Sequence, residues 1–180
     1  MNRRIPRVAA LAVVALMAAG PAVAQGKITP VDRAFVREMI PHHRMAVGMA
    51  DMAEMQATHA RLKTLAASIV EDQNAEIREL TAIRKRLKVK PLPGGHEEHE
   101  AMMRDADTRG LSMDEMGMMI THHQGAIRMA RAELAKGTSG QLRRLARAIV
   151  AAQKREITQM NIWRKAWYGA RSPSGGVPPT

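Results

Sequence analysis

Two pairs of adjacent histidines are the residues of this sequence whose types and spacing point most directly to chemistry. His42 and His43 lie in the segment "MIPHHRMAVGMA", and 80 residues later His122 and His123 lie in "MITHHQGAIRMA", with seven of twelve positions identical. Imidazoles bind Cu(II), Zn, Ni and Fe, and thioethers favour Cu(I). Because both segments combine the two ligand types, they indicate a site with a metal-linked or proton-linked role.

Polar residues recur at matching places in two further segments. "LAASIVEDQNAEI" and "LARAIVAAQKREI" are again 80 residues apart, and both carry a Gln-x-x-Glu pair on an otherwise apolar helical stripe: Gln73 and Glu76, then Gln153 and Glu156. A polar pair on a core stripe is costly unless it is hydrogen-bonded. When each hairpin is folded at its turn, each Glu comes level with the histidine pair of its own repeat.

The elements that must position these residues are helices. Apolar residues recur at a helical period throughout both repeats, and strand signals are absent. Thr29 and Ser112 are suited to begin the first helix of each repeat as N-caps. The sequence predicts an all-α four-helix bundle of two duplicated hairpins, about 30–88 and 112–168, joined by a linker at about 89–111.

The two histidines of each pair point in different directions. Neighbouring helical residues diverge by about 100°, so His43 shares its face with apolar residues and points to the core. His42 lies beside it, on a flank that also carries Met45 and Met49. We expect the four histidines and the two glutamates to form one polar layer near mid-height. Two alternatives remain open: a polar core that is only hydrogen-bonded, and methionines that only fill space.

The N-terminus has the pattern of a secretory leader. A basic start, a short apolar run and the small residues "AVA" predict a signal peptide at 1–24, cleaved near Ala24-Gln25. The mature domain then covers 25–168, and the Pro- and Gly-rich tail at 169–180 is expected to be disordered. No other apolar run is long enough to span a membrane. We therefore expect a periplasmic or secreted protein.

Composition narrows the ligand chemistry. The chain has no cysteine, and its formal charge of +11 falls to +8 without the three basic leader residues. Export and the scarcity of aromatic residues disfavour a nucleic-acid partner. Without thiolates, a soft metal in an oxidising compartment must use Met and His, which argues for copper. Further candidate ligands, which could instead be packing residues and a solvated loop, are His59, His96, His99, Met102 and Met103.

A di-iron carboxylate bundle is the closest rival architecture. Such sites need Glu-x-x-His motifs, and no histidine here has a Glu three residues before it. The His-Glu-x-x-His motif of zinc proteases is absent as well. A metal-binding protein is favoured over an enzyme. The alternatives are a ferritin-like redox metalloprotein that oxidises Cu(I) or Fe(II), and a structural or interaction bundle without metal.

Over about 30–168 the doubled Met-Ile-x-His-His motif and the following Gln-x-x-Glu-Ile resemble the domain of unknown function 305 family. These are exported, ferritin-like helical proteins, some of them tied to copper binding and copper tolerance. The resemblance implies a four-helix bundle. From the residues themselves we expect uptake of copper in the periplasm, with other periplasmic copper-handling proteins as candidate partners. The resemblance carries ligand roles onto Met39, His42, His43, Met49, Met119, His122, His123 and Met129. Pro41, where the second repeat has Thr121, departs from the motif.

Overall fold

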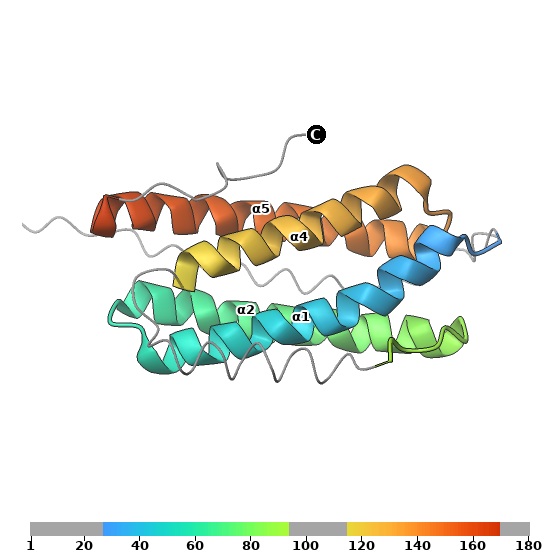
Figure 1. The fold of residues 1–180 in the computed structure, drawn as a ribbon, viewed down its shortest axis with the longest axis horizontal. Helices are drawn as coiled ribbons and strands as arrows, with labels where there is room; N and C mark the ends of the chain where they lie inside the picture. The colour runs from blue at the N-terminus through green and yellow to red at the C-terminus, as the bar shows by residue number, and fades with distance from the viewer. Residues whose placement is uncertain (1–26, 94–114, 170–180) are drawn as a thin grey trace, which may run out of the picture.

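Four helices make up the described part of the chain. The computed structural model describes residues 27–93 and 115–169. Within these ranges no strand occurs, which confirms the all-α prediction, and the helices are α1 (Pro30–Gln56), α2 (Ala60–Arg86), α4 (Glu115–Lys136) and α5 (Gly140–Tyr168) (Figure 1). The predicted leader, the tail beyond Gly169, Ser112, and the loop candidates His96, His99, Met102 and Met103 lie outside the described residues.

The start of α1 is fixed by a capping box. The Thr29 hydroxyl accepts a hydrogen bond from the Asp32 backbone N–H at 3.1 Å, and the Asp32 carboxylate accepts one from the Thr29 N–H at 2.7 Å. Pro30 occupies the first helical position, where its missing donor costs nothing. The helix continues through Pro41 to Gln56. The turns of the two hairpins fall at 57–59 and 137–139.

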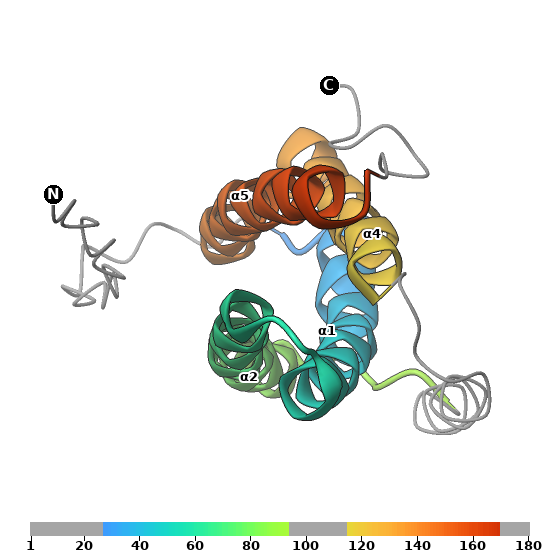
Figure 2. The same ribbon diagram turned by 90° about the vertical axis from the view of Figure 1, so that its left-hand side faces the viewer.

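The two hairpins meet mainly through their first helices. α1 packs on α2, α4 packs on α5, and α1 and α4 supply the main contact between hairpins. Figure 1 shows α1 and α4 running in opposite directions, and Figure 2 shows both in the middle, with α2 and α5 farther from the interface. The doubled histidines therefore lie on the pair of helices that joins the repeats.

The core consists of two apolar clusters. In one, Val36 and Ile40 of α1 join Ala130 of α4; in the other, Ala50 of α1 joins Ile120 of α4. Because α1 and α4 are antiparallel, the N-terminal half of α1 packs near the C-terminal half of α4, and the C-terminal half of α1 near the N-terminal half of α4. Four buried polar residues also come from the middle of the helices, with 0–3% of their surfaces exposed: His43, Gln73, His123 and Gln153.

A buried carboxyl pair ties the start of α1 to the α4–α5 turn. The Asp32 carboxylate accepts hydrogen bonds from the backbone N–H groups of Thr138 (3.1 Å) and Ser139 (2.9 Å). Burial opposes ionisation of Asp32, but these bonds and those from Thr29 outweigh it and lower its pKa. Burial, a hydrogen bond to Asp32 and the Asp32 charge raise the pKa of the fully buried Glu133 to about 8. Glu133 is therefore mostly protonated at neutral pH.

Candidate metal centre

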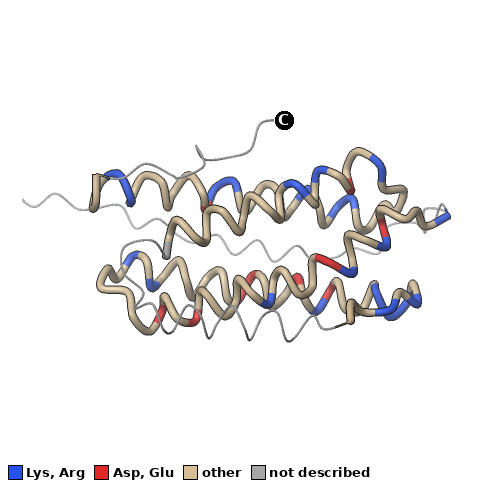
Figure 3. The backbone as a smooth tube through the Cα atoms, viewed as in Figure 1, with Lys and Arg blue, Asp and Glu red and all other residues tan. Residues whose placement is uncertain are grey.

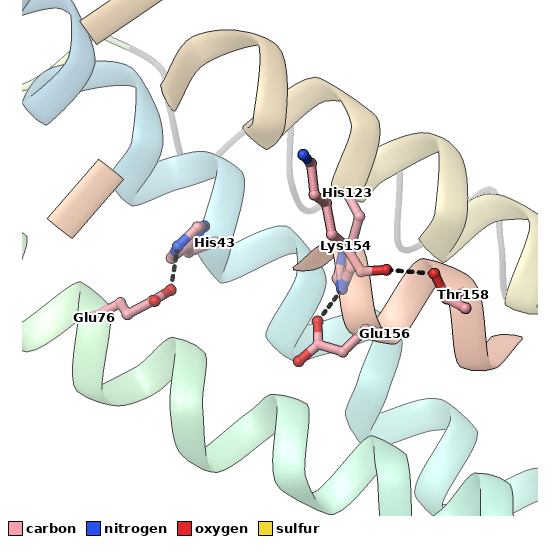
Figure 4. Close-up of polar contacts among 6 residues, drawn as sticks. All are labelled: His43, Glu76, His123, Lys154, Glu156 and Thr158. Atoms are coloured by element: carbon pink, nitrogen blue, oxygen red, sulfur yellow. Dashed lines mark hydrogen bonds and ion pairs between the residues drawn. The ribbon is translucent and has the colours of Figure 1, made fainter. Parts of the chain in front are cut away.

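Each hairpin contains one buried histidine–glutamate pair. His43 Nε2 lies 2.7 Å from Glu76 Oε2, and His123 Nε2 lies 2.6 Å from Glu156 Oε2 (Figure 4). Both imidazoles are fully buried, whereas the two glutamate side chains are 18% and 14% exposed. The sequence placed each Glu level with the histidine pair of its own hairpin, and the structure shows this arrangement in both repeats.

These bonds determine which ring nitrogen is free. An ionised carboxylate can only accept a hydrogen bond, so Nε2 of a neutral His43 or His123 carries the proton. Nδ1 then has a lone pair, and in both rings Nδ1 is buried without a hydrogen-bond partner. A carboxylate that fixes the tautomer and orientation of an imidazole is the usual outer partner of a metal-binding histidine.

The other two histidines meet across the hairpin interface. The ring centroids of His42 and His122 are 3.7 Å apart, and the ring planes are tilted by 37°. Three of their nitrogens are buried without a hydrogen-bond partner: His42 Nδ1, His122 Nδ1 and His122 Nε2. Buried polar atoms are normally satisfied. Unpartnered nitrogens on two facing rings are therefore what a site for a ligand would show.

Gly125 permits this close approach. A Cβ atom at Gly125 would lie 2.9 Å from His42 Nε2, which is closer than van der Waals contact. At the matching place in the first repeat the chain has Met45, which is half-buried. The two repeats therefore differ at this position, where α4 must leave room for His42.

Both interface histidines are electrically neutral at neutral pH. Burial, followed by the neighbouring His43, His123 and Arg128, lowers the pKa of His42 to about 3. Burial and the nearby histidines also lower the pKa of His122 well below its usual value. Metals bind the neutral imidazole. The burial and the neighbouring charges that disfavour protonation of His42 and His122 thus keep nitrogen lone pairs available for a metal ion.

Methionines belong to both core clusters. Met39 and Met129 belong to one apolar cluster, and Met49 and Met119 belong to the other. Met39 is fully buried, and Met49 and Met119 are 9% and 5% exposed. Each cluster thus contains one of these four candidate thioethers from α1 and one from α4, and the second cluster also contains Met116 and Met160. Their packing follows from helical spacing, so burial alone assigns them no ligand role.

His59 does not join the central layer. Its ring stacks on Trp167 with centroids 3.8 Å apart, at the end of the bundle where α1 meets α2. The same Trp167 ring also stacks on Trp163, with ring centroids 5.2 Å apart. This aromatic stack has no signal in the sequence, because residues more than a hundred positions apart meet only after folding. Met55, four residues before His59, is 70% exposed.

The donor set suits a soft metal better than a hard one. Within residues 27–93 and 115–169, no three His, Asp or Glu side chains are grouped as a metal site. Asp72 is an acidic residue near both glutamates of the histidine–glutamate pairs. Burial, followed by the charges of Glu156 and Glu76, raises the pKa of Asp72. What the centre offers is neutral imidazole nitrogens, with thioethers in the adjoining clusters. Such donors select Cu(I) over oxygen-seeking cations such as Ca²⁺ or Mg²⁺.

The fold and site define a class of protein: a helical bundle of two repeats, with doubled histidines at its centre. The sequence matches the family model described as "Domain of unknown function (DUF305)" over residues 32–164, with a second match over 114–178. The chain belongs to this family, as the resemblance predicted. A search of curated proteins gave no match.

Solved structures with the same fold include proteins crystallised with metals. CopM in the Cu(I)-bound form is 35% identical, with a TM-score of 0.67 over 77% of this chain and 98% of CopM. CopM in the Cu(II)-bound form is 32% identical, with a TM-score of 0.66 over 76% and 97%. A DUF305 fragment from Deinococcus radiodurans is 26% identical, with a TM-score of 0.66 over 78% and 99%. None of the described helices is both long and apolar enough to cross a membrane.

Proposed function

We propose that this protein binds copper outside the cytoplasm and buffers it or passes it on. The observation that carries the proposal is the facing pair His42 and His122, with three buried ring nitrogens that have no hydrogen-bond partner. A bundle stabilised only by its polar core would satisfy these atoms or replace them by apolar ones. The CopM structures support copper as the metal, because a relative of this length and identity was crystallised with Cu(I) and Cu(II).

His42 and His122 would supply the primary nitrogen ligands. His43 and His123 offer Nδ1 lone pairs on rings that Glu76 and Glu156 hold in place. Bound copper would be held as a cargo ion by these soft and borderline donors. Thioethers of the adjoining clusters are the second donor class: Met39, Met49, Met119 and Met129, with Met45 beside the histidine pair in sequence.

The leader pattern at 1–24 places this activity after export. A Cys-free site of histidine and methionine does not depend on thiols, which an oxidising compartment would convert to disulfides. In the periplasm the protein would exchange copper with other copper-handling proteins. The loop residues His96, His99, Met102 and Met103 would be accessory ligands, whereas His59, whose ring stacks on Trp167 at the end of the bundle, would take no part in the central site.

A competition titration tests the proposal. The chain without residues 1–24 is titrated with Cu(I) against a chromophoric chelator, as wild type and as the double variant His42→Ala/His122→Ala. We expect the double variant to lose at least tenfold in affinity. His59→Ala is the matched control: it removes one imidazole from the end of the bundle, and we expect its affinity to stay within twofold of wild type.

Circular dichroism and urea denaturation separate metal binding from folding. If the double variant keeps its helices and still binds Cu(I) as tightly as wild type, the central site is wrong. If wild type itself does not compete with the chelator, copper binding is wrong. Equal losses in His59→Ala and the double variant would move the site to the bundle end.

A further inference from the structure

A pocket of about 250 Å³ lies beside α1, and none of its lining residues is a candidate copper ligand. It is enclosed by α1, the C-terminal turn of α2 and the segment after α2, and it has two kinds of lining. The basic lining consists of Arg37, Arg44 and Arg84, and the apolar lining of Ile40, Pro41, Pro91 and Leu92. Among the residues that the structure describes, no acidic side chain lines it.

The guanidinium groups of Arg37 and Arg84 are only weakly neutralised by the contacts around them. Arg37 has an ion pair with Glu38, but at 3.7 Å and with both side chains more than 40% exposed. Such surface pairs contribute little. The Nε atom of Arg37 is buried and has no hydrogen-bond partner. Arg84 donates from Nη1 to the Val89 carbonyl at 3.5 Å, the long limit of a hydrogen bond.

The surrounding surface adds to this positive charge. Figure 3 shows lysines and arginines gathered at the end of α2, the helix that contributes Arg84 to the pocket. Among them, Lys85, Arg86, Lys88 and Lys90 follow Arg84 within six residues. A concave site with one sign of charge concentrates field lines and attracts ions of the opposite sign. Guanidinium groups match carboxylate and phosphate oxygens in planar, paired hydrogen bonds.

The apolar lining makes the expected ligand more than an inorganic ion. Ile40, Leu92 and the rings of Pro41 and Pro91 form walls that cannot hydrogen-bond a phosphate or sulfate ion. The volume is slightly below the range of drug-sized pockets. We propose that this pocket binds a small organic anion, with its carboxylate or phosphate group on Arg37 and Arg84 and its apolar part against the prolines.

This inference is independent of copper binding. None of the three arginines belongs to the candidate metal centre, and the ligand needs no metal. The pocket nevertheless includes Pro41, the residue before His42, so its ligand would bind next to the segment that carries the copper site. Failure of the copper titration would leave the anion site intact, and the reverse also holds.

Nuclear magnetic resonance of the arginine Nε–Hε groups tests the proposal. The full mature chain is titrated with benzoate and phenyl phosphate as organic anions, and with benzyl alcohol and inorganic phosphate for comparison. We expect saturable shifts of a few Nε–Hε signals with both organic anions, binding by inorganic phosphate at least tenfold weaker, and no saturation with benzyl alcohol.

Charge-matched variants identify the site. Arg37→Gln/Arg84→Gln removes two positive charges from the pocket, and Arg147→Gln/Arg155→Gln removes two from the exposed surface of α5. We expect the pocket variant to lose at least tenfold in affinity for benzoate and the control to stay within twofold. If the pocket variant does not keep its helices, Arg44→Gln, an exposed position, replaces it, with an expected loss of at least threefold. Equal losses in pocket and control variants, or equal binding of benzyl alcohol, would refute the organic-anion site.

Discussion

Gly125→Ala separates the stability of the bundle from its proposed copper site. In the interior of α4, replacing Gly by Ala favours the helix by about 1 kcal/mol. The new Cβ, however, would lie 2.9 Å from His42 Nε2, whereas ordinary contacts fall at about 3.5–4.0 Å. The imidazole must therefore move by roughly 0.5 Å or more, and with it the contact to His122. Moving a ring costs less than moving a backbone, so the two effects should nearly cancel.

We expect a free energy of unfolding within about 1 kcal/mol of wild type, and Cu(I) affinity lowered by about 10–100-fold, as when the support of a metal ligand is lost. Urea denaturation measures the first and chelator competition the second. Gly140→Ala is the matched control, because its Cβ would meet only Arg144 Nη1, at an ordinary 3.7 Å. Copper affinity of Gly125→Ala within twofold of wild type would refute a copper site at the His42–His122 pair.

The remaining predictions concern the buried titratable groups. Below pH 6.5 the unfolded chain protonates His42 and His122 while the folded chain does not, so stability should fall as the pH drops from 6.5. Above its ordinary pKa the unfolded Glu133 is ionised while the folded one keeps its proton up to about pH 8. Stability should thus peak near pH 6.5 and decline toward pH 8 by at most about 1.4 kcal/mol per pH unit. Urea denaturation across pH checks this, and Glu133→Gln should remove the decline; a decline that persists would show that another group causes it. Glu156→Ala leaves His123 Nε2 buried without an acceptor and should cost about 1–3 kcal/mol. Glu156→Gln, whose amide oxygen can still accept, should cost less, and equal costs in denaturation would contradict the role of this bond.

The fold could be predicted from the sequence because its signals are local or repeated. The capping box at Thr29 depends on residues three positions apart, and the hairpin turns follow helix-breaking or polar segments. The duplication itself gave the pairing of His43 with Glu76. Residues equally far from a hairpin turn must come level, whatever the details of packing.

The sequence does not predict how the two hairpins pack against each other. The sequence assigned His42 to a methionine-lined flank, but in the structure its ring lies against His122 of the other repeat. Nothing local to either segment specifies which flank faces which. That choice depends on the crossing of α1 and α4, and so on how all the apolar faces of both hairpins pack at once.

The sequence by itself thus determined four helices, their repeat, and the histidine–glutamate pair inside each hairpin. Tertiary structure alone decided that His42 and His122 face each other, that Gly125 must be small, and that three arginines surround one pocket. The physical reason is how far apart in the sequence the residues that determine each feature lie. Helical period and hairpin register follow from neighbouring residues, whereas contacts between hairpins depend on side-chain volumes distributed over the whole chain.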